Sequence, residues 1–196
     1  TGSICDELAK KHKSVRVVHQ QNQGYGGALK TGFSQAQYDW VFFSDGDLQF
    51  DFSEIQKFIP YTDAKNTKNK DKKEYVLIIG FRKNRAEGAK RRLIMQMLKI
   101  WNKIFLNFPL YIKDVDCAFK LLKKDVIKTV IPLHSSGGMI STEFLLKAIK
   151  KDFKIKQIGV THYLRKSGSS TGDTKNVISK AVSETFLLRK IFKNYE

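Results

Sequence analysis

Residues 40–51, WVFFSDGDLQFD, carry the strongest indication of the fold. They begin with an apolar run, WVFFS, that stops abruptly at acidic residues, as buried strands of parallel sheets do. In open α/β sheets, ligands bind beyond the carboxyl ends of such strands. Asp45, Asp47 and Gln49 alternate along the chain, so in extended geometry their side chains share one face. We therefore expect a ligand site directly after this strand.

The chemistry of these three side chains favours a divalent cation. Two carboxylates and an amide oxygen are hard ligands, which suit Mg²⁺ or Mn²⁺ together with water and phosphate oxygens. A second interpretation is an acidic turn whose aspartates cap a helix. Asp51 suits such a cap for a helix that begins near Phe52. Both interpretations stay open on this evidence.

Outward from this stretch, β-rich and helical patterns alternate along the chain, which predicts an α/β fold with a mostly parallel sheet flanked by helices. The predicted strands are residues 15–19, 40–44, 76–79, 116–122 and 154–164. The predicted helices are residues 1–11, 28–37, 52–59, 91–108, 125–130, 142–150 and 175–193. No repeat or change of composition divides the sequence, so we expect a single domain over residues 1–196.

The composition narrows the class of protein. The 196 residues include 36 Lys plus Arg and 19 Asp plus Glu, a formal charge of +17. With 41% hydrophobic residues the chain is ordinary globular material, which excludes disorder throughout. The charge indicates nucleic acid, an anionic membrane surface or a phosphorylated substrate as partner, or simply a solvated lysine-rich surface. Cys5 and Cys117 form no disulfide framework and predict reduced, buried thiols.

Two of the predicted helices carry apolar stripes. The stripe of residues 91–108 predicts core packing, and its members are Leu93, Met97, Leu98, Trp101, Ile104, Phe105 and Phe108. In residues 175–193, apolar positions stand against lysines and arginines. That pattern suits a helix that covers the core or one that lies on a bilayer surface.

The acidic stretch resembles the D-x-D-x-Q motif of GT-A fold, family 2 glycosyltransferases, and the branch that includes dolichol-phosphate mannosyltransferases and other polyprenyl-phosphate glycosyltransferases is the most similar. Five further segments resemble this branch in the right order: 22–32 (NQGYGGALKTG), 80–92 (GFRKNRAEGAKRR), 114–122 (DVDCAFKLL), 141–148 (STEFLLKA) and 160–172 (VTHYLRKSGSSTG). The family's Pro-x-Tyr/Phe-Asn-Glu and Asp-Asp-Gly-Ser motifs do not occur here. The chain thus resembles an N-terminally incomplete GT-A domain without its first βαβ unit, and its sheet edge would be open to pairing with another chain.

The resemblance implies inverting transfer of a sugar from a nucleotide-sugar donor to a polyprenyl (dolichyl or undecaprenyl) phosphate, peripheral to the cytoplasmic face of a membrane. It implies that Asp45, Asp47 and Gln49 hold Mg²⁺ or Mn²⁺ and that Asp45 also contacts the donor. Guanidinium forks bind phosphate bidentately. The positions that the resemblance assigns to substrate and phosphate binding are Arg82, Arg91, Arg92, Arg165 and Gly26.

The same resemblance assigns Asp116 as the base or the residue that orients the acceptor, with Asp114 as a close alternative. It assigns Glu143 as a helix-borne acid, although a glutamate in a first helical turn also satisfies the helix dipole. Two other functions stay open. One is a non-catalytic GT-A-like binding module, because the first unit is missing. The other is a basic nucleic-acid-binding domain, which we do not expect because no aromatic-interleaved basic patch or nucleic-acid motif occurs.

Overall fold

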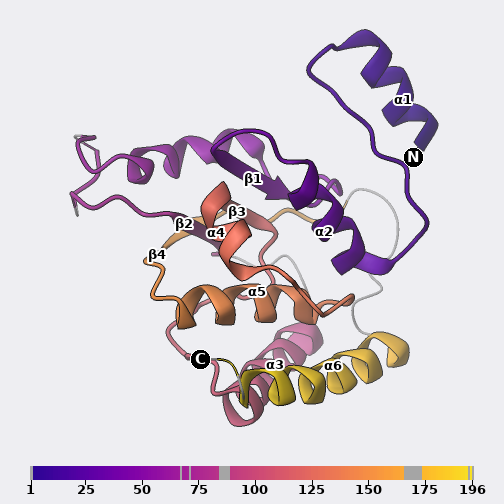
Figure 1. The fold of residues 1–196 in the computed structure, drawn as a ribbon, viewed down its shortest axis with the longest axis vertical. Helices are drawn as coiled ribbons and strands as arrows, with labels where there is room; N and C mark the ends of the chain where they lie inside the picture. The colour runs from indigo at the N-terminus through magenta and orange to yellow at the C-terminus, as the bar shows by residue number, and fades with distance from the viewer. Residues whose placement is uncertain are drawn as a thin grey trace.

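The computed structural model describes residues 2–66, 68–70, 72–83, 89–165, 174–193 and 195, without the side chains of residues 89–92 and 95. Helices and strands alternate along most of this chain (Figure 1). The elements are α1 (Gly2–Lys11), α2 (Gly24–Gln35), β1 (Trp40–Ser44), η1 (Phe52–Lys57), η2 (Ile59–Thr62), β2 (Leu77–Arg82), α3 (Ala89–Leu106), β3 (Phe119–Lys123), α4 (Lys124–Val130), α5 (Met139–Lys150), β4 (Ile155–Val160) and α6 (Lys175–Lys193).

The sheet has the strand order β1-β3-β2-β4. β3 runs antiparallel to both of its neighbours, whereas β2 and β4 are parallel. β1, β2 and β4 therefore point in one direction, and β3 points in the other. The α/β class is confirmed, but the prediction of a mostly parallel sheet is wrong for the hydrogen-bonded pairs, because β3 lies between two strands that share a direction. A strand buried on both faces is a continuous apolar run in either direction, so the sequence did not reveal this reversal.

Alternate residues of the central strands face two separate apolar clusters. Leu77 and Ile79 of β2 pack on the side of the α-helices, and Ile78 between them packs on the side of η1 and η2. Leu122 and Leu121 of β3 divide between the same two sides. Both faces of the sheet are thus covered, which is why β1 (WVFFS) and the first five residues of β2 (LIIGF) are continuous apolar runs rather than alternating ones.

Three of the longer α-helices, α3, α5 and α6, lie on one side of the sheet in two layers. α5 lies next to the sheet, and α3 and α6 lie side by side beyond it (Figure 1). Asn102 Nδ2 of α3 donates to Thr142 Oγ1 of α5 at 3.3 Å. Trp101 Nε1 of α3 donates to Thr185 Oγ1 of α6 at 3.1 Å. These contacts join the α3–α6 pair and tie α3 to the layer beneath it.

The predicted core stripe of α3 is only partly in the core. Phe108, just after the helix, is buried, and Trp101 and Phe105 are half-buried against Phe186 of α6. By contrast, Leu93, Met97 and Ile104 are 59%, 62% and 69% exposed, so core packing is wrong for these residues. They belong with Ile100 to a face of α3 that neither α5 nor α6 covers. We call Leu93, Met97, Ile100 and Ile104 the outer face of α3.

Several predicted boundaries also need correction. Residues 15–19 form neither a strand nor a helix, so the strand predicted there is wrong. They follow α1, which has no buried residue and stands apart from the body in Figure 1. Residues 52–59 form 3-10 turns, η1 and the start of η2, rather than one α-helix. β3 begins at Phe119, so Asp116 lies in the turn before it. α6 spans the predicted range, residues 175–193.

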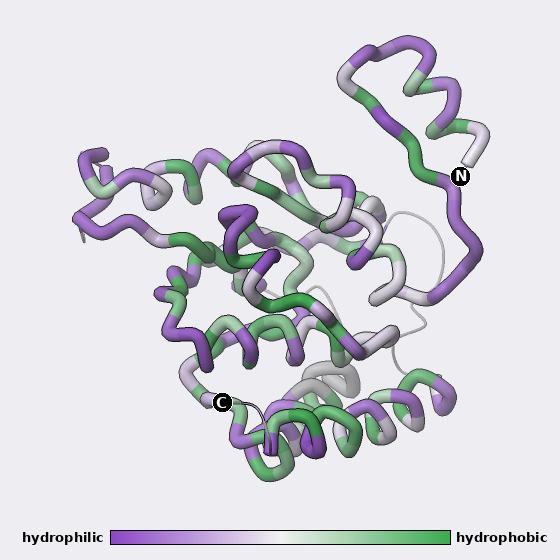
Figure 2. The backbone as a smooth tube through the Cα atoms, in the orientation of Figure 1, coloured by the Kyte–Doolittle hydropathy of each residue, from purple (hydrophilic) through white to green (hydrophobic). Residues whose placement is uncertain are grey.

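The hydrophilic tract at residues 64–74 lies between η2 and β2 and contains no helix or strand in its described part. Figure 2 shows it as a mostly hydrophilic extension at the left of the molecule. Across the described ranges, every helix is too short or too polar to cross a lipid bilayer.

Candidate functional site

A cleft of about 950 Å³ opens at the carboxyl ends of β1 and β2. Its polar rim comes from the loop after β1, the end of β2, the turn before β3 and the segment after β4, and includes Asp45, Asp47, Gln49, Arg82, Asp116 and Arg165. Its apolar wall comes from α3 and α6 and includes Met97, Leu98, Trp101, Val177, Ile178 and Val182. The cleft therefore joins a charged end to an apolar end.

The loop after β1 and the segment after β4 meet at this rim. Arg165 Nη2 donates to Asp47 Oδ2 at 2.8 Å and lies 3.4 Å from Gln49 Oε1. Gln49 Nε2 in turn donates to the carbonyl oxygen of Tyr163 at 3.0 Å. Three residues predicted for the site, from segments more than a hundred positions apart, are thus within hydrogen-bonding distance.

The surroundings of Asp45 disfavour the ionised form of its carboxyl group. Burial raises the pKa of Asp45, and the charge of Asp47 raises it further. The positive charges of Lys120, Arg165 and Arg82 oppose that shift. Carboxylate oxygens that repel one another and already bind a guanidinium group are suited to bind a metal cation, because the cation removes the repulsion.

Asp51, the third acidic residue of the stretch, has a different role. Its side chain accepts from the backbone N–H of Ser53 at 2.9 Å and caps η1. Hydrogen bonds from the side chain and the backbone of Ser53 lower the pKa of Asp51. The helix-cap interpretation is therefore correct for Asp51, although the helix is of the 3-10 type.

Arg82 forms a two-pronged ion pair with Asp114. Its Nε and Nη2 donate to the two carboxylate oxygens at 2.7 and 2.8 Å, and its backbone N–H donates to Asp114 Oδ2 at 3.2 Å. The two side chains are only 7% and 4% exposed. Because the ion pair is buried and bidentate, Asp114 holds the guanidinium group of Arg82 in place. Asp114 is likewise engaged, which argues against its candidacy as the base.

Asp116 lines the cleft from the turn before β3. Tyr25, in the first turn of α2, also lines the cleft. Burial raises the pKa of the Tyr25 phenol, and the charges of Asp45 and Asp116 raise it further, so the phenol is neutral and able to donate. The two carboxylates and the phenol thus face a common space.

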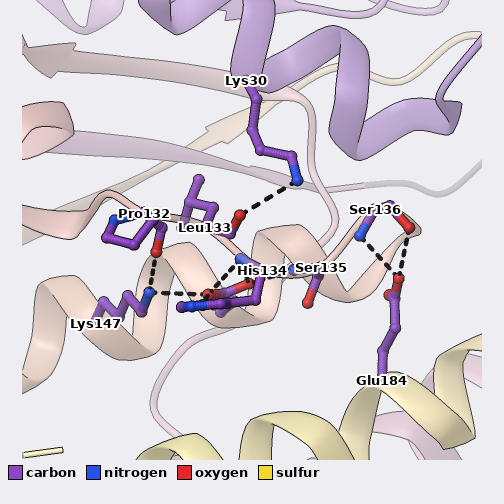
Figure 3. Close-up of polar contacts among 9 residues, drawn as sticks. Lys30, Pro132, Leu133, His134, Ser135, Ser136, Lys147 and Glu184 are labelled. Carbon is purple, nitrogen blue, oxygen red and sulfur yellow. Dashed lines mark hydrogen bonds and ion pairs between the residues drawn. The ribbon is translucent and has the colours of Figure 1, made fainter.

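Glu143 lies behind the cleft rather than on its lining. Its carboxylate accepts from the backbone N–H groups of His134 and Ser135 at 2.9 and 2.8 Å, from His134 Nδ1 at 3.0 Å and from Lys147 Nζ at 2.9 Å. Burial alone would raise the pKa of Glu143, but these hydrogen bonds hold it below its usual range. Figure 3 shows Lys147 also reaching the carbonyl of Pro132. Glu143 is therefore a structural anchor for the segment before α5.

Glu184 of α6 continues this anchoring, and the sequence analysis missed it. Its Oε1 accepts from the backbone N–H of Ser136 at 2.8 Å (Figure 3) and from that of Gly137 at 2.7 Å. Four consecutive amides, residues 134–137, are thus held by two buried glutamates from different helices. The available signal was that Glu184 is the single acidic residue in the sequence of α6.

Gly26 serves close packing in this geometry. Its N–H donates to the carbonyl oxygen of Ser136 at 2.9 Å, and a Cβ at this position would lie 2.8 Å from Ser136 Cα. The predicted role of Gly26 in phosphate binding is therefore not supported, because its amide is directed at the chain and not at the cleft. Arg91 and Arg92 fall in the first turn of α3, and their side chains lie outside the described residues.

Comparison with known proteins places this site in context. Residues 1–130 match the family described as Glycosyl transferase family 2. The chain is 30% identical over 168 residues to the dolichyl-phosphate beta-glucosyltransferase of Saccharomyces cerevisiae, which covers 81% of this chain and 50% of the relative. It is 25% identical over 189 residues to the dodecaprenyl-phosphate galacturonate synthase of Rhizobium johnstonii, with 93% of this chain and 52% of the relative covered.

The fold is also found among solved structures. Glucosyl-3-phosphoglycerate synthase from Mycobacterium tuberculosis, crystallised with Mg²⁺ and uridine-diphosphate, superposes with a TM-score of 0.62 at 15% identity, over 88% of this chain and 56% of that protein. At this identity the likeness establishes the fold alone, and it confirms the predicted GT-A class. The chain spans about half the length of the curated relatives it matches.

Proposed function

Because the chain belongs to glycosyl transferase family 2, we propose that it transfers a sugar, with inversion, from a nucleotide-sugar donor to a polyprenyl phosphate. The observation that carries the proposal is the cleft itself, where Asp47, Gln49 and Arg165 meet at a charged rim that continues into an apolar wall. A substrate pair with a diphosphate on one side and a lipid phosphate on the other needs both environments. The names of the relatives, a dolichyl-phosphate glucosyltransferase and a dodecaprenyl-phosphate galacturonate synthase, support the same pair of substrates.

The donor end of the cleft would be the acidic rim. Asp45 and Asp47 supply carboxylates and Gln49 an amide oxygen, and the guanidinium group of Arg165 already occupies the place of a cation among them. This donor set fits Mg²⁺ or Mn²⁺. When bound, such an ion neutralises charge that develops on the leaving diphosphate.

Arg165 would act on the acceptor side. Its side chain is 35% exposed and reaches the rim from a segment separate from the acidic loop, so it can turn from Asp47 to an incoming phosphate. Arg82 stays in its fork with Asp114 and adds positive potential to the cleft. Arg91 and Arg92 remain predicted phosphate ligands at the start of α3.

Asp116 would orient the acceptor. A polyprenyl phosphate is already anionic near neutral pH, so the reaction needs less from a general base than transfer to a sugar hydroxyl does. Asp116 belongs to the polar rim of the cleft, whose apolar wall is formed by α3 and α6. We assign it the alignment of the attacking phosphate with the donor sugar.

The apolar wall and the outer face of α3 would meet the lipid. Met97 belongs to both, because it lines the cleft and is 62% exposed. An exposed apolar helix face beside a cleft is typical of membrane contact. Lysines and arginines near an anionic surface add about 1 kcal/mol each. We place the protein at the membrane periphery on the cytoplasmic face.

The direct test is sugar transfer into an organic-phase lipid product. The chain is incubated with Mn²⁺, dolichyl phosphate and a panel of labelled UDP- and GDP-sugars. Labelled lipid is expected with at least one donor. Asp47→Asn is expected to reduce the rate of transfer about 100-fold, because the rim then loses a carboxylate that would hold the cation, and the cation is what neutralises charge on the leaving diphosphate.

The matched control is Asp125→Asn, which removes an exposed carboxylate paired with Lys128 and should leave transfer unchanged. Donor binding without transfer by the unaltered chain would instead support the non-catalytic binding module.

A further inference from the structure

Lys120 is a charged residue at the centre of the sheet. It lies in β3, and only 1% of its surface is exposed. Its Nζ donates to the backbone carbonyl oxygen of Val115 at 3.1 Å and to that of Cys117. The ring of Phe43 lies 5.5 Å from the same nitrogen. Burial of an ammonium group is strongly unfavourable without such partners, so its presence here calls for a specific reason.

The two carbonyl groups identify that reason. Val115 and Cys117 stand on either side of Asp116, so Lys120 closes the turn that presents Asp116 to the cleft. β3 supplies a rigid base for this contact, because it is hydrogen-bonded to strands on both sides. The contact with β3 therefore fixes the position of Asp116 relative to the sheet, so the position does not depend on the loop alone.

The charge of Lys120 also acts within the cleft. Burial lowers the pKa of Lys120, and the neighbouring groups Cys117, Asp116 and Asp114 oppose that shift. Lys120 in turn opposes the rise in the pKa of Asp45. Its ammonium group therefore interacts electrostatically with the carboxylates of Asp45, Asp114 and Asp116.

We propose that Lys120 is a positioning residue for Asp116: its ammonium group fixes the turn at residues 115–117 through the carbonyl groups on either side of Asp116 and keeps a positive charge near that turn. The inference rests on the proposed function, since it concerns the step that Asp116 would serve. A residue that merely filled the core would need neither a charge nor hydrogen-bond donors. Methionine has a similar length and would then replace it without loss.

The first test is a double-mutant cycle on sugar transfer. Lys120→Met is expected to lower kcat about 10- to 100-fold, with KM for the donor changed less than about threefold, because alignment and not donor binding is lost. In an Asp116→Asn background the same substitution should cause little further loss. Lys123→Met, on the same strand but paired with Glu74, is the control and should leave kcat unchanged.

The proposal is overturned if Lys120→Met leaves kcat unchanged, or if it lowers kcat by the same factor in both backgrounds. If Lys120→Met does not fold, the same measurements are made on Lys120→Gln, because glutamine keeps an N–H donor but lacks the charge. If the unaltered chain transfers sugar and both Lys120 variants match it, only this inference fails, and the proposed function stands.

The second test needs no activity. Hydrogen exchange of the amides of residues 115–118 should be about tenfold faster in Lys120→Met than in Lys123→Met, since the turn loses its tie to β3. Equal exchange in the two variants would show that Lys120 does not hold the turn. This readout separates a failure of the inference from a failure of the proposed function.

Discussion

At the scale of single residues, the buried ion pair between Arg82 and Asp114 determines which charged side chains of the cleft are available to bind a substrate. Both side chains are buried, and each satisfies the other through two short hydrogen bonds. Two opposite charges held in this way are costly to separate. Of the two described arginines that line the cleft, Arg165 is partly exposed and is therefore the one better able to change partners when an anionic substrate arrives.

Removal of the Asp114 charge should destabilise the fold. Asp114→Asn removes the negative charge that accepts from Nε and Nη2 of the buried Arg82 guanidinium group, and we expect a loss of about 3–5 kcal/mol in the free energy of unfolding. Urea denaturation measures this loss. Asp125→Asn breaks an exposed pair with Lys128 and should cost less than about 1 kcal/mol. Equal losses in the two variants would contradict the account of the buried fork.

The residue types of the rim could be predicted from the sequence, but their partners could not. The strand-then-acid pattern brought Asp45, Asp47 and Gln49 to one cleft edge, as expected. The pairing of Arg82 with Asp114 depends on how β2 and the turn before β3 meet in space, and the sequence does not encode that distance locally. The same holds for Glu184, whose amide partners lie 48 and 47 positions away.

At the scale of elements, α3 has two faces with different tasks. One face packs on α6 through Trp101 and Phe105, and the outer face is open. Helical periodicity identifies the apolar positions of such a helix but does not say how wide a stripe the neighbours cover. That is why core packing was predicted for Leu93, Met97 and Ile104, and why the structure was needed to separate them. The reversed direction of β3 escaped prediction for a similar reason, since burial on both faces hides it.

The outer face of α3 should determine membrane affinity. The test variant is Ile100→Glu, because Ile100 belongs to this face and is 58% exposed. Co-sedimentation measures how tightly the protein binds phosphatidylcholine vesicles that contain phosphatidylserine. We expect about tenfold weaker binding, because an apolar contact is lost and an acidic group is brought to an anionic surface. Tyr38→Glu is the control, since Tyr38 is 81% exposed but precedes β1, away from the cleft. An equal effect of both substitutions would argue against a specific membrane face.

At the scale of the whole molecule, the cleft is a product of the entire fold. Its lining reaches from Gly24 at the start of α2 to Val182 in α6, and the sheet, α5 and the α3–α6 pair hold these segments together. The family match covers residues 1–130, so it includes the acidic rim and Asp116 but not Arg165 or α6. The charged end and the apolar end of the cleft therefore depend on contacts between parts of the chain that are distant in sequence.

The most direct measurement of the central claim is the melting temperature of the chain with and without Mn²⁺ and UDP. If the acidic rim binds a cation with a diphosphate, the two ligands together at about 100 times their dissociation constant should stabilise the fold by about 2.7 kcal/mol, a rise of roughly 5–10 °C. Asp47→Asn should abolish the rise, and Asp51→Asn, which alters only the cap of η1, should keep it. No rise in the unaltered chain, or the same rise in Asp47→Asn, would contradict the account.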